Sequence, residues 1–120
     1  KYASNVGCSD RGCQRVHMSV INPEDGFKLE CDSSESCRSA VITIVMSDGA
    51  EIDSIACGGE QGCRDAVIHI VNEGSATVNI KEWDCEGLNA CTDATFNLKG
   101  NVNVEECNCS HDGCINVSTT

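Results

Sequence analysis

Alternating apolar and polar residues recur at four places along the chain, each time shortly after a cysteine. Three, five and seven residues after that cysteine the side chains are apolar, and the residues between them are mostly polar. The apolar positions are Val16, Met18 and Val20; Ala40, Ile42 and Ile44; Ala66, Ile68 and Ile70; and Ala94, Phe96 and Leu98. A period of two predicts a β-strand with one buried face and one solvent-facing side.

A second group of apolar positions precedes each cysteine loop. The residue two positions before the leading cysteine is Val6, Leu29, Ile55, Trp83 or Cys107. Further back, apolar pairs such as Val78 and Ile80 straddle a polar residue, and a glycine turn separates this region from the preceding strand. Each repeat therefore predicts a strand, a glycine turn, a strand, a short bent strand and a cysteine loop.

The cysteine loops mark an internal repeat. Their leading cysteines, Cys8, Cys31, Cys57, Cys85 and Cys109, follow one another at steps of 23, 26, 28 and 24 residues. Such a period is typical of solenoids. We expect one domain, residues 1–120, with repeats at about 1–20, 21–44, 45–70, 71–98 and 99–120.

One repeat holds too few inward side chains to form a core, so its neighbours must cover them. Parallel stacking of equivalent strands about 4.8 Å apart aligns like residues in columns. The sequence predicts an all-β fold, a small disulfide-stapled parallel β-helix (β-solenoid) of four to five coils. The alternative is a disulfide-rich β-sandwich, whose antiparallel hairpins would have turn signals only at Asp25-Gly26 and Asp48-Gly49.

Cysteine makes up 11 of 120 residues, a density that indicates an oxidising, extracellular compartment. We expect a secreted or cell-surface protein. Pairing within each loop gives five disulfides, Cys8–Cys13, Cys31–Cys37, Cys57–Cys63, Cys85–Cys91 and Cys109–Cys114, each contributing about 2 kcal/mol. Bridges between stacked coils are a second possible connectivity. Zinc ligands come as Cys-x2-4-Cys knuckles in closely placed fours, whereas these loops have four or five intervening residues and recur on successive coils.

The eleventh cysteine, Cys107, falls in the inward column of Trp83. Its position predicts a buried thiol that packs as a small apolar side chain. An intermolecular disulfide and pairing with Cys109 or Cys114 are the alternatives.

The net charge of -11 argues against nucleic acid as a partner, since no basic patch accompanies it. Asp65 and Asp93 share one outward column on adjacent coils, which makes them candidate calcium ligands; no other cofactor is indicated. The longest apolar run, residues 40–46, is too short to span a bilayer.

Asn108 and Asn116 begin two Asn-x-Ser sequons and are candidate N-glycan acceptors in a secreted glycoprotein. Catalysis requires convergent groups, and His17, His69 and His111 are widely separated, so we do not expect an enzyme. An ice-binding solenoid would need a regular Thr-x-Thr ladder, which the mixed outward columns lack.

The chain begins with the end of one repeat and stops in the middle of another. Open strand edges of a solenoid must be capped or paired. We therefore expect a structural subunit of an extracellular filament or surface layer, assembling head-to-tail as a homopolymer. A fragment of a longer repeat array and a secreted calcium- or glycan-binding adhesion module are the alternatives.

The motif Cys-x5-Cys-x-x-Ala-x-Ile occurs at Cys37–Ile42 and Cys63–Ile68. It resembles cysteine-rich β-helix repeats in surface proteins of algae and other protists, and the likeness covers most of the chain. The first and last repeats depart from it through shorter loops and valine in place of alanine. The resemblance implies a cell-surface or fibre glycoprotein, such as a subunit of a flagellar hair or similar appendage, and no catalytic residue.

Overall fold

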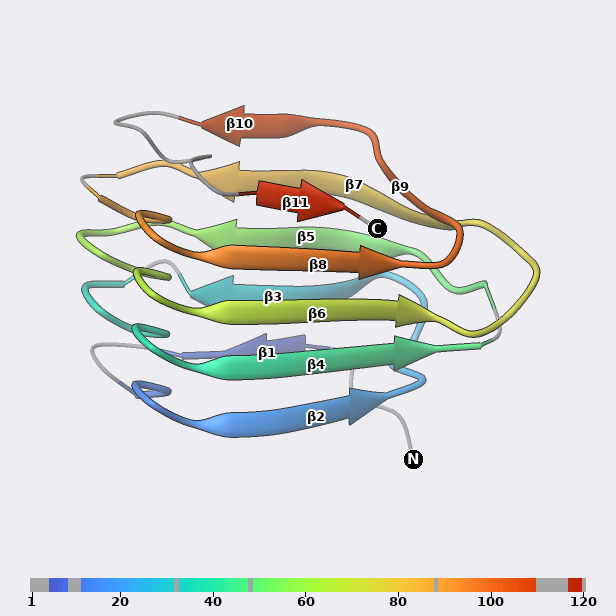
Figure 1. The fold of residues 1–120 in the computed structure, drawn as a ribbon, viewed down its shortest axis with the longest axis horizontal. Coiled ribbons are helices and arrows are strands. Elements are labelled where there is room, and N and C mark those ends of the chain that lie inside the picture. The colour runs from blue at the N-terminus through green and yellow to red at the C-terminus, as the bar shows by residue number, and fades with distance from the viewer. Residues whose placement is uncertain are drawn as a thin grey trace.

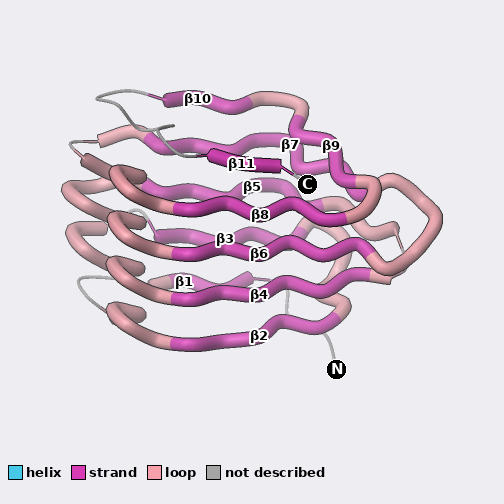
Figure 2. Tube along the Cα trace, viewed as in Figure 1, coloured by secondary structure: helices cyan, strands magenta, loops and turns pink. Residues whose placement is uncertain are grey.

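The computed structural model describes residues 5–8, 12–31, 33–47, 49–87, 89–109 and 117–119. The regular secondary structure of these residues is entirely β-strand (Figure 2). Sheet A contains β1 (Asn5–Gly7), β3 (Phe27–Cys31), β5 (Ile52–Cys57), β7 (Val78–Cys85), β9 (Val102–Val104) and β10 (Cys107–Cys109). Sheet B contains β2 (His17–Ile21), β4 (Val41–Met46), β6 (Val67–Asn72), β8 (Thr95–Lys99) and β11 (Val117–Thr119).

The chain alternates between the two sheets, so that each coil gives one side to sheet A and the other to sheet B (Figure 1). Sheet A is ordered β1-β3-β5-β7-β10, with β9 beside β7, and sheet B is ordered β11-β8-β6-β4-β2. Every strand pair is parallel. This confirms the predicted parallel β-solenoid, and the sandwich alternative is wrong because its hairpins would pair antiparallel.

The interior is built from columns of like side chains. In sheet B, Ile42 aligns with Ile68 and then Phe96, and Ile44 aligns with Ile70 and then Leu98. All of these side chains are buried. The structure therefore confirms the inward face that the alternation predicts. A strand of period two in parallel register presents the same face on every coil.

Sheet A is less regular than sheet B. The register shifts between Phe27 and Lys28, so that β5 carries one more residue than β3, at Asp53. In β7, Lys81 and Glu82 both lie outside the core between buried Ile80 and Trp83. The predicted strand and short bent strand therefore form one continuous element in β5 and β7, because the extra residue takes up the bend.

The corner after each disulfide has the same backbone conformation on successive coils. Arg15, Ser39, Asp65 and Asp93 have φ between 59° and 61°. Each is the third residue of a tight turn, such as the one closed by the Ala40 N–H donating to the Cys37 carbonyl at 3.1 Å. Backbone N–H groups of the corner also donate to the next coil, for example from Ser39 to Arg64 O at 2.8 Å. The cysteine loops are thus a third, hydrogen-bonded side of the solenoid.

Gly62 lies at a corner where the backbone of its own cysteine loop and that of the preceding coil both come close. A Cβ at this position would overlap the carbonyl oxygen of Gly58 and lie 2.6 Å from that of Cys31. The absence of a side chain is therefore a packing requirement at this corner.

Asn72 is a polar residue in an otherwise apolar inward column. It follows Met46 in register and is 6% exposed. Its Nδ2 donates to Ala76 O at 2.7 Å and Asn101 O at 2.8 Å, while Oδ1 accepts from the Gly74 N–H at 3.0 Å. The side chain therefore ties together the turns that connect sheet B to sheet A in two coils, and its burial is fully compensated.

Candidate functional site

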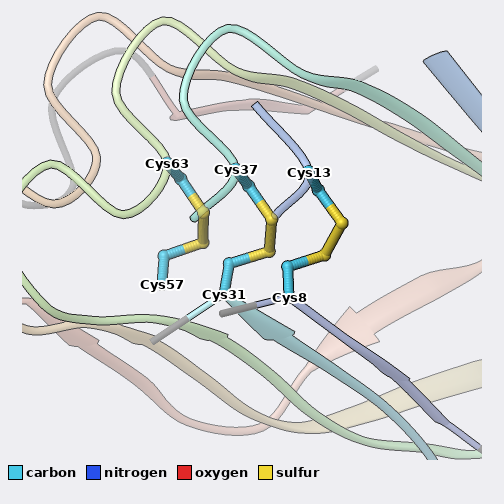
Figure 3. The surroundings of a disulfide bond; sticks show 6 residues. All are labelled: Cys8, Cys13, Cys31, Cys37, Cys57 and Cys63. Atoms are coloured by element: carbon cyan, nitrogen blue, oxygen red, sulfur yellow. A yellow bond between two sulfur atoms is a disulfide. The ribbon is translucent and has the colours of Figure 1, made fainter. Parts of the chain in front are cut away.

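A column of disulfides runs along one edge of the solenoid, between the end of each sheet A strand and the corner that follows (Figure 3). The pairs are Cys8–Cys13, Cys31–Cys37, Cys57–Cys63 and Cys85–Cys91, with Cα–Cα distances of 5.5–5.7 Å. They are four of the five predicted pairs, and Cys109–Cys114 lies outside the described residues because Cys114 is not among them. Each bridge closes a small ring within one coil.

Sulfur atoms of adjacent coils lie close together in this column. The Sγ atoms of Cys8, Cys31 and Cys37 lie within 4.8 Å of one another, and so do those of Cys57, Cys85 and Cys91. Each group combines a disulfide of one coil with one sulfur of the neighbouring disulfide. The alternative bridges between coils are therefore sterically accessible, although the structure has the pairs within coils.

Cys107 aligns with Trp83 in the predicted column, but the expectation of a buried side chain is wrong. It is exposed because β10 is an edge strand of sheet A in the described structure. Its sulfur belongs to none of the four disulfides described above. Partial desolvation, and to a smaller extent the negative charge of Asp84, raise the pKa of the Cys107 thiol, so the neutral form prevails at pH 7.

Of the two sequon asparagines, the structure describes Asn108. It aligns with Asp84 in the outward column of β7, and its Nδ2 donates to Asp84 Oδ1 at 2.8 Å. The nitrogen that would carry a glycan thus has a carboxylate partner. Asn116 lies outside the described residues.

The two calcium candidates, Asp65 and Asp93, occupy equivalent left-handed corner positions on adjacent coils, and both side chains are exposed. The Asp65 N–H donates to Thr92 O at 3.0 Å, which fixes their separation to one coil spacing. Within the described residues, the groups of three potential ligand atoms less than 4.8 Å apart consist of cysteine sulfurs. A calcium site at these aspartates stays a prediction.

The outer face of sheet A is strongly charged. A shallow groove of about 430 Å³ crosses it, lined by Lys28, Asp53, Ser54, Lys81, Glu82 and Glu106. Lys81 Nζ lies 3.4 Å from Glu51 Oε1 and 3.6 Å from Asp53 Oδ1, and these carboxylates raise the pKa of Lys81. The sequence did not indicate this groove, because the extra residue in β5 and β7 decides which charges share the outer face.

The end of the groove formed by Glu82 and Glu106 is acidic. Asp84 is the main cause of a raised pKa at Glu82, followed by desolvation and by Glu106. Three carboxylates on neighbouring positions of β7 and the segment before β10 therefore repel one another at neutral pH.

The outer face of sheet B, defined by the outward side chains of β2, β4, β6 and β8, has a different character. In register these side chains form three columns across the four strands. The Val41 column is His17, Val41, Val67 and Thr95; the Thr43 column is Ser19, Thr43, His69 and Asn97; and the Val45 column is Ile21, Val45, Val71 and Lys99. The Thr43 column holds a hydrogen bond between Asn97 Nδ2 and His69 Nδ1, at 3.1 Å.

Two of the three histidines considered for catalysis lie on the outer face of sheet B. His17 and His69 belong to different columns of this face, two coils apart, and His111 lies outside the described residues. The Val41 and Thr43 columns hold Ser, Thr, Val, His and Asn, as the sequence indicated, and an ice-binding role stays untested.

No family model matches the chain, and neither the curated proteins nor the solved structures include a significant match. Among the described residues, the structure has no helix long and apolar enough to cross a membrane.

Proposed function

We propose that this chain is a structural subunit of an extracellular filament or surface layer, in which coils of one subunit stack on coils of the next. The observation that carries the proposal is the in-register repetition of the coil. Each inner strand of either sheet has a parallel partner on both sides, with the same residue columns continuing through the contact. A coil built in this way offers the next coil a matching template.

The edge strands support the same proposal. In the described structure β1 and β2 at one end, and β10 and β11 at the other, each pair with a strand on one side. Parallel edges of this kind present rows of backbone N–H and C=O groups that a further coil can satisfy. Because the strands of each sheet all run parallel, the edges at the two ends are complementary and contact between subunits is heterologous, which generates an open polymer.

Side chains at the two ends favour continued stacking as well. Val6 and Met18 at one end, and Val102 and Val104 at the other, are half-buried and pack against the core. Their column partners in the middle coils, such as Leu29 and Ile42, are fully buried. Covering the end residues with another coil would remove further apolar area from water, at about 25 cal/mol per Å².

The extracellular setting rests on the disulfides and on the repeat motif. Four disulfides in a small domain require an oxidising compartment to form and persist. The likeness of the Cys-x5-Cys-x-x-Ala-x-Ile motif to repeats in surface proteins of algae and other protists supports a surface glycoprotein, with Asn108 and Asn116 as its candidate glycan acceptors. In a longer repeat array, further coils of the same chain would pair with these edge strands in the way that a second subunit would.

Electron microscopy of the purified chain tests the proposal. We expect filaments with an axial repeat of about 24 Å, which is five coils at about 4.8 Å each. A monodisperse monomer across the whole concentration range would contradict self-assembly.

A pair of variants shows whether the edges make the contact. Met18→Lys places a charge on the half-buried side chain of edge strand β2 and should abolish filaments. Glu60→Gln, in an exposed cysteine loop, changes the net charge by the same amount and should leave filaments intact. Equal loss in both variants would show that net charge, rather than stacking of the edges, controls assembly.

A further inference from the structure

The outer face of sheet B carries no carboxylate at any of its three columns on β2, β4, β6 and β8. This is unexpected in a chain with 19 Asp and Glu residues and a net charge of -11. The outer face of sheet A, on the other side of the same coils, carries Glu30, Asp53, Glu82 and Asp84 against the two cations Lys28 and Lys81, so that its net charge is negative. The acidic charge of the molecule is therefore distributed asymmetrically about the two sheets.

This asymmetry determines how two copies can approach each other. Contact through the outer face of sheet A would bring two surfaces of net negative charge together, which is unfavourable between molecules of high like charge. Contact through the outer face of sheet B avoids that local repulsion, because Lys99 is the one Asp, Glu, Lys or Arg among the outward side chains of β2, β4, β6 and β8.

The same face is apolar enough to associate. Ile21 is 60% exposed and is the one large hydrophobic residue of the described chain that is exposed. It continues in register into Val45 and Val71 on the next two strands. The Val41 column, on the other side of the face, adds Val41 and Val67.

The three columns also make the face complementary to itself. On β4 and β6, valines of the Val41 and Val45 columns flank the polar Thr43 column, while His17, Thr95 and Lys99 are the polar members of these two columns on β2 and β8. A two-fold axis in the plane of the face, along either the strands or the solenoid axis, places the valines of β4 and β6 on one another and the Thr43 column on itself. An isologous contact needs this property.

We propose that the outer face of sheet B is a lateral interface, against which the same face of a second copy of this chain packs. The two facing sheets would lie about 10 Å apart, as in other sheet-on-sheet packings. This contact is distinct from the stacking of coil edges, since it uses side chains of a sheet face rather than backbone groups, and it does not depend on the proposed filament.

The size of the face predicts a weak contact between single subunits. Four strands at about 4.8 Å spacing and five residues at about 3.3 Å cover roughly 320 Å². Two such faces bury roughly 640 Å². Specific, stable interfaces bury about 1,200–2,000 Å², which is well above this area. In a filament the contacts would add along the length, which converts weak pairing into lateral bundling.

Sedimentation velocity over a concentration series tests the proposal, with Met18→Lys present in every chain so that coil stacking does not add to the measured mass. We expect weight-average mass to rise from monomer toward dimer with concentration, and to rise further at high salt because screening reduces the repulsion between acidic molecules. Adding Val45→Asp and Val71→Asp to this chain should keep it monomeric throughout. The matched control, Ser54→Asp with Ala56→Asp on the outer face of sheet A, changes the net charge equally and should associate like Met18→Lys alone.

Photo-crosslinking locates the contact and separates it from coil stacking. A photoreactive amino acid in place of Thr43 should yield dimers whose cross-linked peptides come from β2, β4, β6 or β8. Circular dichroism and thermal melting of both double variants establish that they are folded. Cross-links to edge strands β1 or β10 instead, or equal association of both folded double variants, would overturn the lateral interface.

Other occupants of this face would give different results. The chain could stay monomeric and instead shape growing ice crystals or bind insoluble polysaccharide. If Val45→Asp with Val71→Asp abolished either activity, the proposal would be overturned in favour of that ligand.

Discussion

The indole ring of Trp83 lies against the phenyl ring of Phe96, with ring centroids 4.5 Å apart and planes inclined by 51°. Trp83 belongs to β7 in sheet A and Phe96 to β8 in sheet B, so the pair joins the two sheets across the core. A tilted geometry at this separation is favourable for aromatic rings. The pair occupies one coil, whereas the corresponding residues of the coil before it, Ile55 and Ile68, are aliphatic.

Removing this contact should destabilise the solenoid strongly. Trp83→Ala leaves a large cavity between the sheets, and we expect the free energy of unfolding to fall by about 3–5 kcal/mol. Urea denaturation followed by circular dichroism measures it. Trp83→Phe should cost less than half as much, because the buried Nε1 of Trp83 has no hydrogen-bond partner among the described residues. Equal losses in the two variants would show that the indole N–H, rather than the ring contact, is what matters.

Gly62→Ala should destabilise by about 3 kcal/mol, the upper end of overpacking, because the added Cβ would overlap the carbonyl oxygen of Gly58. Gly7→Ala is the matched control. A Cβ at Gly7 has no described atom within 4 Å, and removing a glycine from a strand should stabilise by about 0.5–1 kcal/mol. Opposite signs in urea denaturation are the expected result, and a neutral Gly62→Ala would contradict the close backbone contacts at this corner.

Removal of one cysteine of a disulfide should replace a neighbouring bridge within one coil by a bridge between two coils. In Cys31→Ala the thiolate of Cys37 can attack Cys8 Sγ, which breaks Cys8–Cys13, forms Cys8–Cys37 and releases the Cys13 thiolate. Mass spectrometry of peptides from the unreduced protein should detect Cys8–Cys37. In the double variant Cys31→Ala with Cys37→Ala no attacking thiol remains at this coil, so Cys8–Cys13 should persist. Detection of Cys8–Cys13 alone in the single variant would show that the sulfur column does not exchange.

The acidic end of the groove predicts a pH dependence of stability. The pKa of Glu82 is raised in the folded protein, chiefly by Asp84, so the folded state holds this proton more tightly than the unfolded chain. Stability from this group is therefore fully present below the ordinary glutamate pKa and is lost as pH rises through the raised pKa of the folded state. Glu82→Gln should raise the melting temperature at pH 7 relative to the parent chain and have little effect at pH 3.

Glu24→Gln, in the exposed turn before β3, is the control for that comparison because it removes the same charge away from the acidic end of the groove. It should leave the difference in melting temperature between pH 7 and pH 3 nearly unchanged. Equal behaviour of Glu24→Gln and Glu82→Gln would show that total charge, rather than repulsion among Glu82, Asp84 and Glu106, sets the pH dependence.

The sequence by itself determined the parallel solenoid and the inward face of each sheet B strand. A strand has a period of two, and stacking of repeats multiplies that pattern, so Ile42, Ile68 and Phe96 could be aligned from the cysteine spacing alone. The same spacing predicted four disulfides that the structure contains. These features depend on local periodicity, which one chain displays in full.

The tertiary structure alone decided the features that depend on how coils meet. Cys107 holds an inward position in sequence register, yet it is exposed because burial requires a neighbouring coil on each side. The extra residue at Asp53 and Lys81 decided which charges share the outer face of sheet A. The contrast between that acidic face and the carboxylate-free outer face of sheet B therefore required the structure, because the cysteine spacing aligns the outward columns of sheet B but does not reveal the register shift in sheet A.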